Sequence, residues 1–129
     1  MRFIGADGTE RDTAEVFDVG PVAYDVSRAK AIIAAAPREP ELVDLELAAM
    51  LIALGEVTVD PQRADRVDLT EPGIGVATPA GTVLIDGWHR ALRTTLECRA
   101  EMAVYVLTGD EASQIRGYLP DRRNTCPTR

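Results

Sequence analysis

The sequence has few of the side chains that bind transition metals. Its 129 residues include one histidine, His89, and two cysteines, Cys98 and Cys126, which form no Cys-x-x-Cys motif. A structural zinc site takes four Cys or His ligands, so no zinc site is expected and no residue is assigned as a metal ligand. Clustered carboxylates could still hold a hard cation such as Mg²⁺ beside a phosphate.

Long apolar stretches are also lacking. No run approaches the ~18 apolar residues that suggest a membrane-spanning helix, and the N-terminal residues do not have the pattern of a signal peptide. We therefore expect a cytoplasmic protein with no membrane partner, in which both thiols stay reduced.

Positive charge is scarce. Fourteen basic residues stand against 21 acidic ones, and the net charge is −7. Nonspecific affinity for nucleic acid comes mostly from Lys and Arg side chains that release counterions, so this balance disfavours DNA as a partner.

What the sequence does contain is enough apolar character for one core. Hydrophobic residues make up 46% of a chain that has the length of one domain. We predict a single α/β (α+β) domain over residues 1–129, with a small mixed sheet packed by helices. Residues 1–15 and 121–129 are expected to be mobile.

Apolar periodicity and turn residues predict the order of the elements. Residues 1–15 are expected to be loosely held or to form an edge hairpin around Asp7-Gly8, followed by two strands in 16–26 and a helix over 28–36 with Ser27 as N-cap. A second helix is predicted over 40–54, apolar on two faces and closed by Gly55. After it we expect a short strand at 57–59, a charged loop at 60–66, an edge strand or turn at 67–69, strands at 74–77, 82–85 and 102–107, and a last helix from a capping box at 108–111 to about residue 119.

The stretch from Gly81 to Arg93 has the clearest functional pattern. Its apolar run ends at Asp86-Gly87, and helical spacing of apolar residues begins at Trp88. This predicts a buried strand that turns sharply into a helix, with His89 in the first turn and arginines after it. The start of a helix offers unpaired N–H groups and the positive end of the dipole, so basic side chains there predict an anion site.

The hexapeptide Ile85-Asp86-Gly87-Trp88-His89-Arg90, between a strand and turn before it and the strand Glu101–Leu107 after its helix, resembles the signature of the ParB/sulfiredoxin superfamily. The resemblance covers roughly Gly73 to Leu119, and residues 1–70 match only in element order. It implies a small α/β fold in which this corner binds phosphate, either of ATP or CTP with Mg²⁺ or of nucleic acid.

Carried over residue by residue, the resemblance implies that His89 and Arg90 contact the phosphates and that Gly87 lets the backbone approach them. Asp86 would orient the corner or help to hold a metal-bound water, which makes His89 and Asp86 the catalytic candidates. Arg93 would add a further contact. A branch that resembles free serine kinases adds an upstream glutamate as general base, and the sequence does not select among Glu39, Glu41, Glu46, Glu56 and Glu71.

The sequence also departs from the family. In sulfiredoxins the residue before the His-Arg pair is the catalytic cysteine, whereas here it is Trp88, so reduction of a sulfinic acid is not expected. ParB partition proteins more often have Arg-Arg at the corner and a helix-turn-helix domain after it. The chain has no room for such a domain, so a centromere-binding role is not expected.

Each of these residues also has an ordinary structural explanation. Asp86 could be an N-cap, His89 an exposed or capping residue, and the arginines partners of surface carboxylates. Trp88 is expected in the core, and Cys98 as a small buried residue of a helix.

Together these patterns predict a protein that binds a nucleoside triphosphate or a phosphorylated small molecule at Asp86–Arg90. If it is an enzyme, we expect an ATP- or CTP-dependent phosphotransferase or a nuclease acting by phosphodiester hydrolysis. The alternative is a catalytically inert regulatory or protein-interaction module that acts in a DNA-related process.

Overall fold

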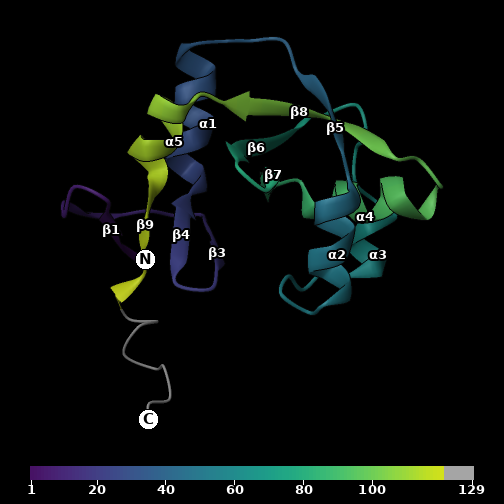
Figure 1. Ribbon diagram of the computed structural model, residues 1–129, viewed down its shortest axis with the longest axis horizontal. Coiled ribbons are helices and arrows are strands. Elements are labelled where there is room, and N and C mark those ends of the chain that lie inside the picture. Colours follow the sequence, from purple (N-terminus) through teal and green to yellow (C-terminus); the bar gives the residue numbers. More distant parts are fainter. Residues whose placement is uncertain (121–129) are drawn as a thin grey trace. The chain divides into compact units, whose positions relative to one another are not determined.

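The computed structural model describes residues 1–120, which form an α+β fold. Contacts divide the chain into two compact units: unit 1 combines Met1–Ala36 with the segment that begins at Gly109, and unit 2 is the continuous stretch Pro37–Thr108 (Figure 1). Unit 2 is therefore inserted, in sequence, between the two halves of unit 1. The prediction of one domain over the whole chain stays a prediction.

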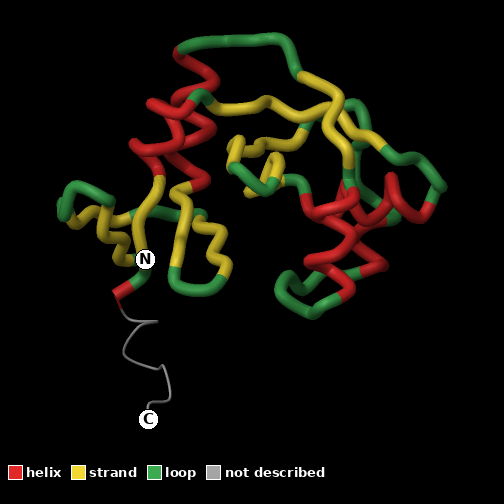
Figure 2. The backbone as a smooth tube through the Cα atoms, viewed as in Figure 1, coloured by secondary structure: helices red, strands yellow, loops and turns green. Residues whose placement is uncertain are grey.

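Unit 1 is built on an antiparallel sheet in the order β2-β1-β9-β4-β3 (Figure 2). Phe3 and Ala23 are fully buried and pack with Leu119 and Val16. The elements are β1 (Arg2–Gly5), β2 (Glu10–Asp12), β3 (Val16–Val19), β4 (Val22–Asp25), α1 (Val26–Ala35), α5 (Gly109–Ile115) and β9 (Arg116–Tyr118).

The structure confirms the N-terminal hairpin and the pair of strands in 16–26. The start of the chain is held by the burial of Phe3 and by the position of β1 inside the sheet. Two helix boundaries in unit 1 differ from those predicted. The N-cap of α1 is Asp25 and not Ser27, whose hydroxyl instead accepts a hydrogen bond from the amide of Glu15. The last helix stops at Ile115, because the following residues pair with β1 and β4 as β9.

Unit 2 contains a mixed sheet in the order β5-β8-β6-β7, in which β6 and β8 are parallel. The predicted strand, turn, strand, helix and strand over 73–107 are confirmed, and Trp88 is buried as expected. The elements are β5 (Glu41–Asp44), α2 (Glu46–Ala53), α3 (Pro61–Ala64), β6 (Gly73–Thr78), β7 (Gly81–Asp86), α4 (Trp88–Leu96) and β8 (Glu101–Leu107).

Several predictions for unit 2 are wrong. Residues 41–44 are a strand and not the first turn of a helix, because they pair antiparallel with β8. Residues 57–59 form no strand, and the predicted loop at 60–66 contains α3. Cys98 lies beyond α4, is exposed and has a φ of 60°, so it is not a buried helical residue. Cys126 lies outside the described residues.

Within residues 1–120, no helix has both the length and the apolar composition needed to cross a bilayer.

Candidate functional site

The predicted corner forms where β7 ends and α4 begins. Gly87 is the N-cap of α4, with a φ of 95° in the left-handed region that favours glycine. A Cβ at Gly87 would lie 3.0 Å from the Cα of Gly73, so two stretches of backbone approach each other closely here. Asp86 is the last residue of β7, in register with Ile74, and so precedes the N-cap instead of occupying it.

His89 receives a hydrogen bond from the segment before α4. Its Nε2 accepts from the backbone amide of Asp60 at 3.1 Å, which requires that nitrogen to be unprotonated. Burial and the nearby charge of Arg63 lower the pKa of His89, while Asp60 acts weakly in the other direction. The contact and the lowered pKa both favour the neutral imidazole, which is a poorer partner for a phosphate than imidazolium.

Arg90 contacts the same segment at two points. Its Nη2 donates to the Glu71 carboxylate at 2.9 Å and its Nε donates to the carbonyl of Asp68 at 3.2 Å. The Arg90 side chain is only 20% exposed, whereas that of Glu71 is 66% exposed. Of the upstream glutamates that the sequence left open, Glu71 is thus the one that the structure brings to Arg90.

Arg93 is the third side chain of α4 that contacts the segment before this helix. Its Nη1 donates to the carbonyl of Asp65 at 2.8 Å and its Nε donates to Glu97 at 3.1 Å, one turn further along α4. The side chains predicted to hold a phosphate therefore bind residues 60–71 to α4 instead. This arrangement is a clamp of three side chains, His89, Arg90 and Arg93, and it requires no ligand.

The described residues offer no ready metal centre. Within residues 1–120, no group of three or more His, Cys, Asp or Glu side chains is placed to hold a metal ion. Asp86, His89 and Glu71 therefore do not form a preassembled site for Mg²⁺.

A groove lies elsewhere in unit 2, with a volume of about 560 Å³. It is lined by the whole of β5, by Glu46, Leu47 and Met50 of α2, and by residues 80–82 at the turn between β6 and β7. The end of Leu47 lies 3.9 Å from where a Cβ on Gly81 would be, so α2 approaches that turn closely.

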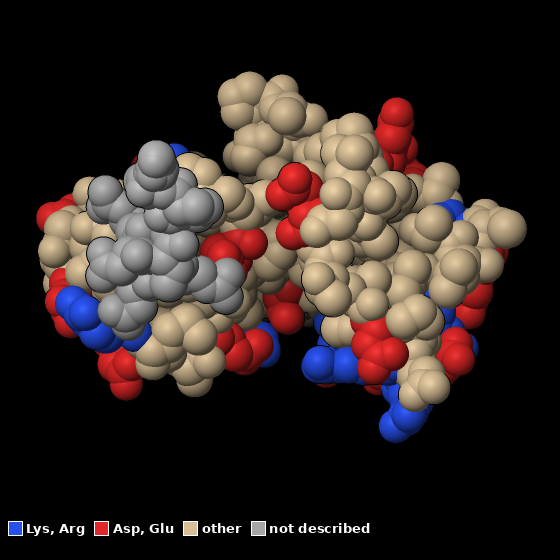
Figure 3. Space-filling view, turned by 90° about the horizontal axis from the view of Figure 1, so that it is seen from below, with Lys and Arg blue, Asp and Glu red and all other residues tan. Residues whose placement is uncertain are grey.

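The groove combines acidic and apolar side chains. Glu41, Asp44 and Glu46 line it, and none of its described lining residues is basic. Leu42 is 71% exposed and Met50 is 49% exposed, so two large apolar side chains face solvent in the same groove as these carboxylates. The face of the molecule drawn in Figure 3 carries both red and blue side chains, whereas the charged side chains that line the groove are all acidic.

The apolar stripe continues along α2 beyond the groove. Leu47, Met50 and Leu54 follow one another at helical spacing, and Leu54 is 66% exposed. This site was not predicted from the sequence, because the apolar pattern of residues 40–54 indicated one continuous helix and not a strand followed by a helix. The predicted helix was apolar on two faces, and a single layer of partners cannot cover both. That pattern was the available signal of an exposed apolar surface.

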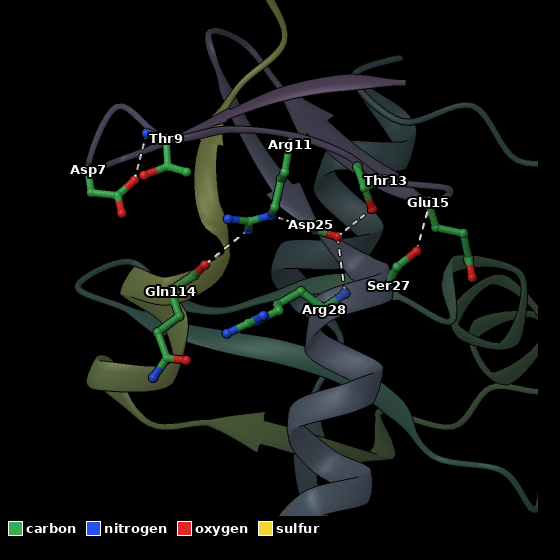
Figure 4. A network of polar contacts seen from close by, with 9 residues as sticks. All are labelled: Asp7, Thr9, Arg11, Thr13, Glu15, Asp25, Ser27, Arg28 and Gln114. Atoms are coloured by element: carbon green, nitrogen blue, oxygen red, sulfur yellow. Dashed lines mark hydrogen bonds and ion pairs between the residues drawn. The ribbon is translucent and has the colours of Figure 1, made fainter.

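Unit 1 contains a separate polar cluster around Asp25, which is 2% exposed. Figure 4 shows Arg11 and Thr13 directed at its carboxylate together with the start of α1. The Thr13 hydroxyl donates at 2.6 Å, the Arg11 Nε at 2.8 Å and the Arg28 amide at 3.1 Å. Burial raises the pKa of Asp25, but these hydrogen bonds outweigh it and the pKa is lowered overall. The carboxylate thus joins β4, α1 and the chain around β2 through three hydrogen bonds.

Comparison of the chain with family models, with curated proteins and with solved structures gives no match. The resemblance to the ParB/sulfiredoxin superfamily and the phosphate-binding roles of Asp86, Gly87, His89, Arg90 and Arg93 remain predictions.

Proposed function

We propose that this protein is a protein-interaction module, and that unit 2 binds a cationic, partly apolar segment of a partner protein in the groove beside β5. The observation that carries the proposal is the groove itself, with about 560 Å³ of space and acidic side chains next to the exposed Leu42 and Met50. Apolar side chains supply the area that binding buries, and carboxylates select a partner of opposite charge.

The clamp at α4 favours the groove over the α4 corner as the binding site. Its donors and acceptors are engaged by residues 60–71, so a phosphate would first have to displace protein partners from His89 and Arg90. The groove needs no such rearrangement, since Leu42 and Met50 already face solvent.

Titration of labelled peptides by fluorescence anisotropy tests the proposal. A peptide that alternates lysine with valine should bind, whereas one with glutamate in place of lysine should not. The variant Glu41→Lys/Glu46→Lys should weaken binding about tenfold, because each exposed charge pair contributes about 0.2–1 kcal/mol and reversal turns attraction into repulsion.

A matched variant separates the groove from net charge. Glu56→Lys/Asp65→Lys makes the same change in net charge at exposed positions of unit 2 outside the groove. It should reduce binding by less than about twofold at 0.15 M salt, where distant charges are screened. Equal losses in both variants would show that peptides bind only through the overall negative field, which would overturn the proposal.

Phosphate binding at the α4 corner is the second candidate, favoured by the contact between Arg90 and Glu71. A guanidinium that holds a carboxylate can hold a phosphate in its place, and the exposed Glu71 is free to move into solvent. On this candidate, Glu71→Gln should strengthen binding of ATP or CTP, with or without Mg²⁺, because the competing carboxylate is removed.

The imidazole of His89 reports on this candidate directly. Without ligand its pKa should lie below the ordinary ~6.5 in an NMR titration, and a bound phosphate should raise it. If millimolar nucleotide shifts neither the melting temperature nor the His89 resonances, the candidate is rejected together with catalysis at Asp86 and His89. If nucleotide binds, loss of turnover in His89→Ala and Arg90→Ala would distinguish an enzyme from a sensor.

A further inference from the structure

The groove is bordered by an edge strand. β5 is the end strand of the unit 2 sheet, where β8 is its neighbour on one side (Figure 1). An edge strand presents backbone N–H and C=O groups that a further strand can bind. Because all of β5 lines the groove, a segment bound there runs beside this backbone.

The hydrogen-bond pattern identifies which groups face outward. The amide of Leu45 donates to the carbonyl of Ala100 at 2.9 Å, which continues the register in which Val43 lies opposite Met102 and Glu41 opposite Val104. Bonded and non-bonded residues alternate in an antiparallel pair. Leu42 and Asp44 therefore direct their backbone groups away from β8, toward the open side of β5.

The side chains of β5 determine what can pair with it. Successive residues of a strand point to opposite faces, so Leu42 and Asp44 share one face while Glu41 and Val43 share the other. Each face thus carries one apolar and one acidic residue, with the carboxylates at the two ends of the strand. The complementary segment has cationic residues at both ends and two apolar residues between them.

A second copy of this chain is a poor match for the same edge. Because Leu42 and Asp44 are the residues whose backbone groups face outward, two β5 strands paired antiparallel about Val43 would place Leu42 of each copy opposite Asp44 of the other. Each Asp44 carboxylate would then face an apolar side chain and not a cation, so a segment with cationic residues suits the edge better.

We infer that the partner segment joins the unit 2 sheet as an added strand beside β5, with the pattern cation, apolar, apolar, cation opposite Glu41 to Asp44. This inference rests on the proposed function and specifies its mode of binding. Main-chain hydrogen bonds to Leu42 and Asp44 supply affinity, and the order of the side chains supplies specificity.

Two peptides of the same composition test the order of the side chains. A peptide with the core Lys-Val-Val-Lys should bind the full-length protein about tenfold more tightly than one with the core Val-Lys-Lys-Val, because the second places valine opposite each carboxylate. Equal affinities would overturn the inferred pattern.

Backbone methylation tests strand addition itself. N-methylating alternate residues of the Lys-Val-Val-Lys peptide removes the amides along one edge only. Methylation along the edge that faces β5 should weaken binding about tenfold or more, since it removes hydrogen bonds and adds bulk, whereas methylation along the other edge should have little effect.

Amide exchange supplies an internal control. On peptide binding, the amides of Leu42 and Asp44 should exchange more slowly, while that of Val43, which faces β8, should not change. If both methylated series bind equally and these amides are unaffected, the groove holds the peptide without strand addition and this inference fails while the proposed function stands. If no cationic peptide binds, both fail.

Discussion

At the scale of single residues, Asp25 is the one charged residue that is buried within residues 1–120. Its side chain is 3% exposed, caps α1 and pairs with Arg11, whose guanidinium also lies over the ring of Phe3. Asp25→Ala should lower the free energy of unfolding by about 3 kcal/mol, because the helix loses its cap and a partly buried cation loses its partner. Urea denaturation measures the change.

Asp12→Ala is the matched control for that substitution. Asp12 also carries an ion pair, to the N-terminal amine, but its side chain is 85% exposed. Its removal should cost less than about 0.5 kcal/mol, as for other exposed pairs. Similar costs for Asp25 and Asp12 would show that burial of the Asp25 cluster contributes nothing.

The lowered pKa of Asp25 makes its contribution depend on pH. As the pH falls through the ordinary aspartate value of about 3.9, the unfolded chain takes up a proton before the folded one. The stability from the Asp25 carboxylate is therefore complete above that pH and is lost as the pH falls through the folded pKa.

The difference in unfolding free energy between the wild type and Asp25→Asn should thus be largest near neutral pH and shrink below about pH 4. Carboxylates such as Asp7 and Asp68, whose pKa values are also lowered, are present in both proteins and cancel from the difference. A difference that stays constant between about pH 7 and pH 2 would contradict this assignment.

Sequence patterns identified residues better than they identified the partners of those residues. Burial of Trp88 and the start of α4 followed from local spacing. The partners of His89 and Arg90 lie 29 and 19 residues away along the chain, and no local pattern specifies such contacts. The same three side chains, without the position of residues 60–71, have the pattern of an anion site.

At the scale of elements, the turn from β7 into α4 depends on Gly87. Gly87→Ala should destabilise the protein for two reasons: a left-handed φ costs an L-residue about 1–2 kcal/mol, and the new Cβ would lie against the Gly73 backbone. Gly55→Ala isolates the first cost, because Gly55 has a φ of 75° and nothing within 4 Å of its Cβ position. In thermal denaturation, Gly87→Ala should lose about 1 kcal/mol more than Gly55→Ala; equal losses would indicate that Gly73 moves aside freely.

Elements defined by local signals were predicted and those defined by distant pairing were not. The hairpin of β6 and β7 and the helix after it have their turn residues and periodicity within a short stretch. β5 follows Pro40 and carries acidic residues that also suit a helix start, so only its pairing with β8, some 60 residues later, reveals a strand. β9 was missed for the same reason, since its partners β1 and β4 lie at the other end of the chain.

At the scale of the whole molecule, the candidate binding sites and the buried Asp25 cluster lie in different units. The groove and the α4 clamp belong to unit 2, whereas the Asp25 cluster belongs to unit 1, which receives strands from both ends of the described chain. The order of predicted strands and helices indicated the α+β class but gave no indication of this insertion, because local patterns do not report which distant segments contact each other.

Amide exchange on two variants determines whether the units unfold together. Asp25→Ala weakens a cluster whose contacts all lie in unit 1, and Gly87→Ala strains a turn whose contacts all lie in unit 2. If the units open separately, each variant should speed exchange only within its own unit, and peptide binding beside β5 should survive Asp25→Ala. If instead each variant speeds the slowest amides of both units equally, the chain unfolds as one cooperative domain, as its length alone predicts. The folding of the groove would then depend on the burial of Asp25, and a substitution in unit 1 would lower the apparent affinity for a partner only as far as it raises the unfolded fraction.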